Sequence, residues 1–283
     1  MRVDRYAVIG HPIEHSRSPA IHRMFAAQTG HPIDYLKLLA PLDGFKAAVR
    51  EWFDHGGKGL NVTLPFKVEA CARADRSTAR AQAAGAANVL ALGPEGILAD
   101  NTDGTGLVHD IEHRLNISMQ GAAVLLLGAG GAARGVVKPI LDAGAGRVHI
   151  ANRTPERASE LASHFSASLG HRITSGDLRT LPKGMDLVIN ATSSGLSSEA
   201  SPIDGDALAG ATLAYDMVYG AHATAFMLAA ERAGLPTISD GLGMLVEQAA
   251  ESFLIWRGIR PDCKSVYEAL RLELSPPGGR PRT

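Results

Sequence analysis

Residues 122–133 read AAVLLLGAGGAA, an apolar run that passes without a spacer into a glycine-rich turn. Such a run is typical of a buried parallel strand, and such a turn is typical of the start of a helix. Gly128 permits the tight turn, Gly130 leaves room for a pyrophosphate, and Ala133 is small enough for close helix–strand packing. The unpaired N–H groups and the dipole of that helix start attract phosphate. These residues predict a dinucleotide-binding fold.

The residues after the next predicted strand indicate which dinucleotide is bound. The strand spans Arg147–Ala151 and is followed by Asn152-Arg153-Thr154. An acidic residue there would bind the ribose hydroxyls of NAD, whereas Arg153 and Arg157 offer positive charge to a 2′-phosphate. A glycine motif alone also occurs in ordinary strand–turn–helix connections, but here the strand, the helix and the basic strand end agree. We therefore predict an NADP site.

Composition restricts the class of protein. The chain has 283 residues, with 45% hydrophobic residues, 20% charged residues and a net charge of −1. This length suits about two domains. The chain has no excess of basic over acidic residues, which argues against a nucleic-acid partner, and no apolar run is long enough to span a bilayer. The first residues lack a signal peptide's apolar stretch, and Cys71 and Cys263 form no disulfide framework. We expect a cytoplasmic monomer or homodimer that binds a small molecule.

The region before the glycine motif predicts a second α/β layer. Strands are expected at residues 6–9, 34–39, 59–62, 88–92 and 97–99, and helices at 18–29, 42–55 and from Pro65 onward. A turn at 93–96 would join the last two strands. Alternating strands and helices imply a mostly parallel sheet. The predicted fold class is α/β, with an N-terminal substrate domain and a Rossmann-type domain.

Three polar clusters follow predicted strands of the first region. They are Ser16–Ser18, Asn61–Lys67 and Asn101–Gly106. Ser18, Thr63 and Asp103 are good N-cap types, so helix capping alone would explain any one cluster. It does not explain why hydroxyls, amides, a lysine and an aspartate gather at strand ends, where α/β sheets bind their ligands. We interpret the clusters as a pocket for a small polyhydroxylated acid.

His11–His15 matches the HxxEH pattern of some zinc proteases. That pattern needs a helix with both histidines on one face, whereas here it follows a strand and Gly10 and contains a proline. We predict a loop and no metal site.

Seven segments resemble the signature motifs of the shikimate dehydrogenase family, over residues 6 to about 272. They are Gly10–Pro19, Asn61–Lys67, Asn101–Gly106, Gly128–Ala132, Asn152–Thr154, Asn190–Gly195 and Asp240–Gln248. Arg23, Val89 and Ala225 depart from the common pattern but remove no catalytic or phosphate-binding group. The resemblance implies that residues 1–103, completed by 242–275, form the substrate domain and residues 104–241 the NADP domain. We expect 276–283 to be a disordered tail.

The resemblance also implies a role for each matching residue. Lys67 and Asp103 would be the catalytic pair and would also touch the substrate. Ser16 and Ser18 would bind the substrate carboxylate, with Tyr219 nearby. The other substrate residues would be Asn61, which shapes the pocket, and Thr63, Asn88 and Gln248, which bind ring hydroxyls. The cofactor residues would be Gly128, Ala129, Gly130, Gly131, Ala132, Asn152, Arg153, Thr154, Arg157, Thr192, Met217 and Gly241.

The implied activity is the reversible NADPH-dependent reduction of 3-dehydroshikimate to shikimate, in the pathway to the aromatic amino acids. An ammonium group suits the proton transfer because it donates to the developing alkoxide. The sequence leaves open whether Lys67 acts as proton donor and acceptor or only as an electrostatic and binding group. Gln248 is open as well, since it could be an ordinary polar helix residue. Two other functions also remain: a quinate/shikimate dehydrogenase that uses NAD or NADP, and a non-catalytic NADP-sensing module.

Overall fold

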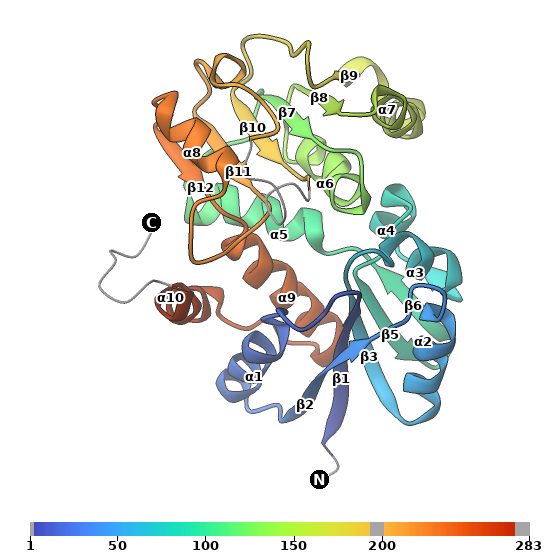
Figure 1. The fold of residues 1–283 in the computed structure, drawn as a ribbon. Coiled ribbons are helices and arrows are strands. Elements are labelled where there is room, and N and C mark those ends of the chain that lie inside the picture. The colour runs from blue at the N-terminus through green and yellow to red at the C-terminus, as the bar shows by residue number, and fades with distance from the viewer. Residues whose placement is uncertain (1–2, 193–200, 275–283) are drawn as a thin grey trace. The chain divides into compact units, whose positions relative to one another are not determined.

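The structure is a computed structural model that describes residues 3–192 and 201–274, and the chain divides into two compact units (Figure 1). The first unit comprises the residues up to Gly106 together with Leu245–Tyr267. The second comprises Leu107–Met244 and the residues from Glu268 onward. The expected tail at 276–283 and the end of the predicted motif at 190–195 lie outside the described residues.

The first unit is built on a six-stranded sheet in the order β2-β1-β3-β5-β6-β4. Its strands are β1 (Asp4–Gly10), β2 (Ile33–Leu39), β3 (Gly57–Val62), β4 (Arg76–Ser77), β5 (Val89–Gly93) and β6 (Gly96–Asp100). Its helices are α1 (Ser18–Thr29), α2 (Phe45–Asp54), α3 (Lys67–Arg73) and α4 (Ala79–Ala84), and the unit boundaries fall within α5 (Asp103–His109), α9 (Leu242–Arg257) and α10 (Cys263–Leu274).

This sheet is mixed rather than uniformly parallel. β1 pairs in parallel with β2 and β3, and β4 pairs in parallel with β6. β5 is antiparallel to β3. It is also antiparallel to β6, because the predicted turn at 93–96 folds the chain back on itself. Both faces of β1 are covered, as the two-residue period of a strand requires. Ala7 and Ile9 pack in a cluster with α2, whereas Tyr6 and Val8 pack with Tyr35 and Trp256.

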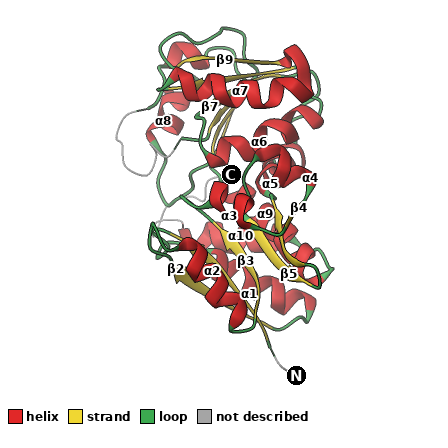
Figure 2. Ribbon diagram, turned by 90° about the vertical axis from the view of Figure 1, so that its right-hand side faces the viewer, coloured by secondary structure: helices red, strands yellow, loops and turns green. Residues whose placement is uncertain are grey.

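The second unit carries an entirely parallel sheet in the order β12-β11-β10-β7-β8-β9. Its strands are β7 (Ala123–Leu127), β8 (Arg147–Asn152), β9 (Ile173–Asp177), β10 (Leu187–Asn190), β11 (Leu213–Asp216) and β12 (Thr237–Ser239). Its helices are α6 (Gly131–Asp142), α7 (Pro155–Leu169) and α8 (Ala225–Arg232), with a π-helical turn at Asp110–Arg114 and 3₁₀ turns at Gly170–Arg172 and Gly205–Leu208. Helix α7 contacts β8 and β9 and lies beside them in Figure 1, and Figure 2 shows it beside β9.

This order places β7 at the centre, with β8 and β9 on one side and β10 to β12 on the other, which is the Rossmann arrangement. Leu187–Asn190 pairs with both β7 and β11, so the strand order reverses between β7 and β10. Open α/β sheets bind ligands at such a reversal. The predicted α/β fold class, with one Rossmann-type sheet, is confirmed.

Several element boundaries differ from the prediction. Ser18 is the first residue of α1 rather than its cap, and Arg17 holds the cap position, because the Ser18 N–H and hydroxyl both bond to Ser16. The helix expected from Pro65 begins at Lys67, after a turn closed by the Phe66 N–H and the Thr63 carbonyl. The loop predicted at His11–His15 is confirmed. In the part of the chain described, no helix is both long and apolar enough to cross a bilayer.

Candidate functional site

The candidate catalytic pair lies in the first unit. Lys67 is the first residue of α3 and Asp103 is the first residue of α5. The Lys67 Nζ donates to Asp103 Oδ2 at 2.5 Å, and the two side chains are 17% and 5% exposed. A cation is disfavoured at the start of a helix, so the Asp103 carboxylate supplies the compensating negative charge. The structure therefore brings the two predicted catalytic residues into direct contact.

Asp103 does not serve as a helix cap. Its Oδ1 accepts from Asn88 Nδ2 at 2.9 Å, and its own N–H donates to Asn101 Oδ1 at 3.1 Å. Asn88 Nδ2 also lies 3.0 Å from Gln248 Oε1, while the Thr102 N–H donates to Asn88 Oδ1 at 2.8 Å. Asn88 and Gln248, two of the three residues predicted to bind ring hydroxyls, thus belong to one buried polar group with Asp103. The capping interpretation of Asp103 is wrong.

Asn61 is fixed by residues that sequence reasoning missed. Its Oδ1 accepts from the Tyr35 hydroxyl at 2.6 Å and from His22 Nε2 at 3.1 Å, and its Nδ2 donates to Ser252 Oγ at 2.9 Å and to the Asn88 carbonyl at 3.3 Å. Burial lowers the pKa of His22 to about 3 and raises the pKa of Tyr35 well above its usual value. Both side chains are therefore neutral donors near pH 7.

His22 stacks on Tyr35 with ring centroids 4.3 Å apart. One sequence signal could have found His22, because it follows Ser18 by one helical turn and so points to the same side of α1. Tyr35 sits in β2, and nothing in that strand's pattern marks it.

The hydroxyl residues of the first unit lie at strand ends. Ser16 and Ser18 share a 3.3 Å hydrogen bond between their hydroxyls, and Ser18 is only 6% exposed. Thr63 directly follows β3, and its N–H donates to the Ile9 carbonyl at 3.0 Å. A Cβ at Gly10 would overlap the Thr63 methyl group, so only glycine allows these two strand ends to approach. Thr63 thus lies at the carboxyl end of β3, and Ser16 and Ser18 lie in the loop and at the helix start that follow β1.

The glycine turn of the second unit has the geometry of a phosphate site. Gly128 follows β7 with a φ of +107°, which favours glycine, and a Cβ there would press on the backbone of Ala191 and on Thr192. Gly130 is the cap residue of α6, and a Cβ built on it meets nothing within 4 Å. Backbone N–H groups at the start of α6 are thus approachable by a pyrophosphate. Ala129, Gly131 and Ala132 complete the turn.

The end of β8 carries the predicted basic residues. Asn152 ends the strand, and its Nδ2 donates to the Thr154 carbonyl at 2.9 Å, which closes the turn into α7. Arg153 and Arg157 are exposed, and within residues 3–192 and 201–274 neither guanidinium has an ion-pair partner. Two exposed cations without a partner at this strand end suit a 2′-phosphate.

Met217 and Gly241 also meet in the second unit. The Gly241 N–H donates to the Val218 carbonyl at 3.2 Å, and a Cβ at Gly241 would overlap the backbone of Met217. Tyr219 is partly buried and belongs to this second unit, whereas Ser16 and Ser18 belong to the first. Its role beside the substrate carboxylate stays a prediction.

A buried carboxylate that the sequence did not reveal organises this strand edge. Asp216, at the end of β11, accepts from Asn190 Nδ2 at 3.2 Å, from the Val218 N–H at 3.1 Å and from Thr224 Oγ1 at 2.5 Å. Burial raises the pKa of its carboxyl group. Asn190 Oδ1 in turn accepts from Thr192 Oγ1 at 2.7 Å. No signal in the strand pattern marks Asp216 as more than a strand-end residue. Among the described residues, no three His, Cys, Asp or Glu side chains lie close enough to hold a metal ion.

Three family models match the chain in order. They are the shikimate dehydrogenase substrate binding domain over residues 8–90, shikimate / quinate 5-dehydrogenase over 110–198, and the shikimate 5'-dehydrogenase C-terminal domain over 241–271. The matched segments contain most of the site residues described above. The chain is also 52% identical over 278 residues to a protein of Aromatoleum aromaticum named shikimate dehydrogenase (NADP(+)), with 97% of this chain and 99% of that one covered.

Solved structures point to the same family as the family models. The structure is similar to an Ael1 enzyme from Pseudomonas putida, with a TM-score of 0.88, 43% identity and 97% and 99% of the two chains covered. It is also similar to shikimate 5-dehydrogenase from Thermus thermophilus in complex with NADP(H) and shikimate, with a TM-score of 0.86, 34% identity and 96% and 100% covered. The resemblance predicted from the motifs is confirmed, and the chain belongs to the shikimate dehydrogenase family.

Proposed function

We propose that this chain catalyses the reversible, NADP-dependent interconversion of shikimate and 3-dehydroshikimate, with Lys67 and Asp103 handling the proton. The observation that carries the proposal is the 2.5 Å contact between Lys67 Nζ and Asp103 Oδ2 inside a polar, largely buried group of side chains. A buried ion pair by itself can also serve only to hold the fold together. Here the pair is surrounded by amides and hydroxyls of the kinds that recognise a polyhydroxylated ring, on a chain whose relatives are named for that substrate.

The proton is the protein's share of the reaction. When bound, the nicotinamide of NADP supplies or accepts the hydride. In reduction the ketone oxygen gains negative charge, and the Lys67 ammonium donates a proton to it; in oxidation the Lys67 amine takes the proton back. Asp103 holds the Lys67 side chain in place and stabilises its charged form. In this proposal Thr63, Asn88 and Gln248 orient ring hydroxyls. Ser16 and Ser18 would bind the carboxylate, and Tyr219 would lie near it.

Features of the second unit support binding of the cofactor. The open backbone at Gly130 and the start of α6 would hold the pyrophosphate, and Arg153 with Arg157 would hold the 2′-phosphate. Ala129, Gly131, Ala132, Asn152, Thr154, Thr192, Met217 and Gly241 would line the rest of that site. We accordingly assign substrate binding to residues 1–103 with 242–275 and cofactor binding to 104–241. We also propose a cytoplasmic monomer or homodimer without nucleic-acid partners.

The test is a spectrophotometric assay of NADP reduction by purified protein with shikimate. Lys67→Ala is the decisive variant, and Lys58→Ala is its matched control, because Lys58 is an exposed lysine of the same unit. We expect Lys67→Ala to lower kcat by about 100-fold or more and to change KM much less, since proton transfer by a positioned group contributes about 10²–10⁴-fold. A variant with normal kcat and only weaker binding would make Lys67 a binding group.

The same assay separates the alternatives. Equal kcat/KM with NAD would overturn the NADP assignment, and equal kcat/KM with quinate would make the chain a quinate/shikimate dehydrogenase. A protein that binds NADP but turns over neither acid would be a sensing module.

A further inference from the structure

Asp103 ends a short buried run that connects β6 to α5. Asp100, Asn101, Thr102 and Asp103 are all 4% exposed or less. The backbone N–H groups of the last three residues each donate to a side chain. The Asn101 N–H donates to Asp100 Oδ1 at 2.7 Å, the Thr102 N–H donates to Asn88, and the Asp103 N–H donates to Asn101. The conformation of the run, and with it the direction of the Asp103 carboxylate, depends on how these side chains are held.

Asp100 is held by a bidentate arginine. Arg80 Nε donates to Asp100 Oδ1 at 2.6 Å and Arg80 Nη2 donates to Oδ2 at 2.9 Å, while Thr78 Oγ1 donates to Oδ1 at 2.6 Å. Two parallel bonds fix both the position and the plane of a carboxylate. The same Asp100 Oδ1 accepts from the Asn101 N–H, so the Asp100 carboxylate links Arg80 directly to the backbone of residues 100–103.

Arg80 also contacts the other side of Asp103. Its Nη1 donates to Thr105 Oγ1 at 3.3 Å, and Thr105 lies in the first turn of α5, two residues after Asp103. One guanidinium therefore joins the residue three positions before Asp103 to the residue two positions after it. It makes these contacts without touching Lys67 or Asp103.

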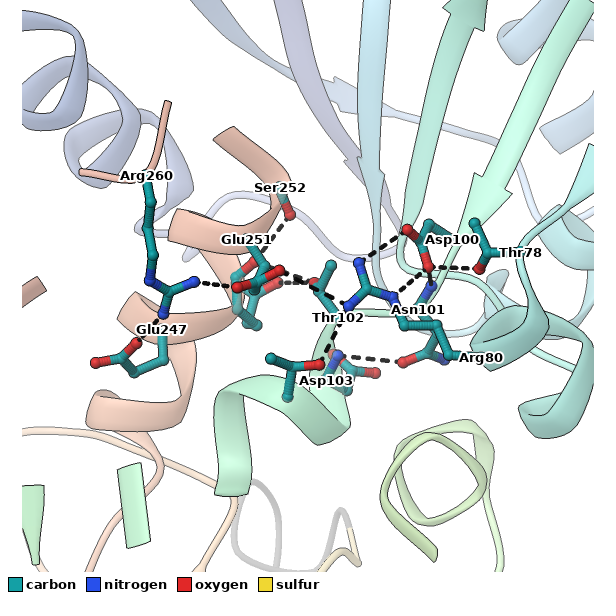
Figure 3. Close-up of polar contacts among 12 residues, drawn as sticks. Thr78, Arg80, Asp100, Asn101, Thr102, Asp103, Glu247, Glu251, Ser252 and Arg260 are labelled. Carbon is teal, nitrogen blue, oxygen red and sulfur yellow. Dashed lines mark hydrogen bonds and ion pairs between the residues drawn. The ribbon is translucent and has the colours of Figure 1, made fainter. Parts of the chain in front are cut away.

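A third contact joins Arg80 to α9. Arg80 Nη1 lies 3.7 Å from Glu251 Oε2, and Figure 3 shows the guanidinium between Asp100 and Glu251. Glu251 is also paired with Arg260, which donates to Glu247 Oε2 at 2.6 Å. Gln248 lies one turn before Glu251 on α9 and touches Asn88. The charged chain thus connects the helix that carries Gln248 to the run that carries Asp103.

We propose that Arg80 is a positioning residue that aligns the Lys67–Asp103 pair for proton transfer, by clamping Asp100 and Thr105 on either side of Asp103. The inference rests on the proposed function, because it gives Arg80 a role only if that pair handles the proton. A purely structural arginine would stabilise the fold without selective effect on turnover. A positioning arginine acts on kcat through Lys67 and Asp103, and its effect vanishes when the pair is already broken.

The experiment compares Arg80→Ala, Arg80→Lys and Thr105→Val with Arg73→Ala. Arg73 is the matched control, because it forms an exposed pair with Glu69 at 3.7 Å in the same unit. We expect Arg80→Ala to lower kcat at least about tenfold with a smaller change in the KM for shikimate and no change in the KM for NADP. Arg80→Lys should recover only part of the loss, because an ammonium cannot bridge Asp100 and Thr105 together. Thr105→Val should lose less, because the Asp100 pair remains.

Two readouts separate positioning from stability. Methylguanidinium in the assay should restore part of the kcat of Arg80→Ala, since the Arg80 side chain is 35% exposed and its site is open to a small cation. In a Lys67→Ala background, Arg80→Ala should lower kcat no further. The inference is overturned if Arg80→Ala keeps kcat within twofold of the control, or if its loss of kcat follows only the fraction of unfolded protein. It is also overturned if the double variant loses kcat by the product of the factors measured for Lys67→Ala and Arg80→Ala alone. Normal turnover by Lys67→Ala alone would instead overturn the proposed function, whatever Arg80→Ala does.

Discussion

Replacement of Asp103 by asparagine tests the contacts at the candidate catalytic pair. The change keeps the size of the side chain but turns one carboxylate oxygen into an NH₂ group. In the protein both oxygens accept, Oδ2 from Lys67 Nζ at 2.5 Å and Oδ1 from Asn88 Nδ2 at 2.9 Å. Whichever way the new amide turns, its NH₂ group faces another donor. Asp103→Asn therefore removes the negative charge beside Lys67 and breaks one of the two hydrogen bonds.

The size of the effect follows from burial. Breaking a buried ion pair by removal of one partner costs about 3–5 kcal/mol. The Lys67 side chain is 17% exposed, so water compensates part of the loss. We therefore expect the free energy of unfolding to fall by about 3 kcal/mol. A hydrogen bond to a charged group is worth about 1.5–3 kcal/mol, and if it is lost in the transition state kcat falls by about 10- to 100-fold.

Both quantities are measured on the same preparation. Initial rates of NADP reduction with shikimate give kcat and KM, and urea unfolding gives the free energy change. Asp54→Asn is the control, because Asp54 forms an exposed pair with Arg50 at 3.5 Å. A kcat for Asp103→Asn within twofold of the unchanged protein, in a sample that is fully folded, would refute the reasoning.

Three further perturbations probe other parts of the molecule. Gly243→Ala should destabilise the protein by about 1–3 kcal/mol in urea unfolding, because the new Cβ would overlap the Asp110 carboxylate, which is 1% exposed; an unchanged midpoint would contradict this packing. Arg153→Ala with Arg157→Ala should raise the KM for NADP by about tenfold or more and leave rates with NAD unchanged, whereas equal effects on both cofactors would exclude a 2′-phosphate role. Burial lowers the pKa of His22 to about 3 from 6.5, so the unfolded chain binds a proton that the folded protein refuses, and stability falls as pH drops from 6.5 toward 3. In His22→Leu, the fall in the free energy of unfolding between pH 6.5 and 3 should be smaller by up to about 4 kcal/mol. Parallel curves of unfolding free energy against pH for the two proteins would disprove it.

Local patterns predicted the parts of the fold that depend on neighbours in sequence. The run from Ala123 into the glycine turn gave the central strand, the phosphate turn and α6, because the tight turn and the helix start depend on residues a few positions apart. The hairpin of β5 and β6 was equally local. The start of α3 was misplaced by two residues, since a proline marks a turn as readily as a helix start and the Phe66–Thr63 bond decides between them.

The contacts that hold the site are not local, and this is why the sequence left them out. Tyr35 and His22 reach Asn61 across 26 and 39 residues, and Arg80 reaches Asp100 across 20. Only the tertiary fold brings such pairs together. A tyrosine inside a strand or an arginine on a short helix carries no mark of its partner. The resemblance to a family named the residues expected to touch ligands, whereas the supporting hydrogen bonds appeared only in the structure.

The central claim is that Lys67 exchanges a proton with the oxygen that becomes the shikimate hydroxyl. The most direct measurement is a crystal structure of the protein with NADP and shikimate bound. The account predicts Lys67 Nζ within about 2.6–3.2 Å of the hydroxyl on the carbon that is oxidised, with Asp103 still bonded to Lys67. Shikimate bound with that hydroxyl beyond hydrogen-bond reach of Lys67, directly or through one water, would contradict it.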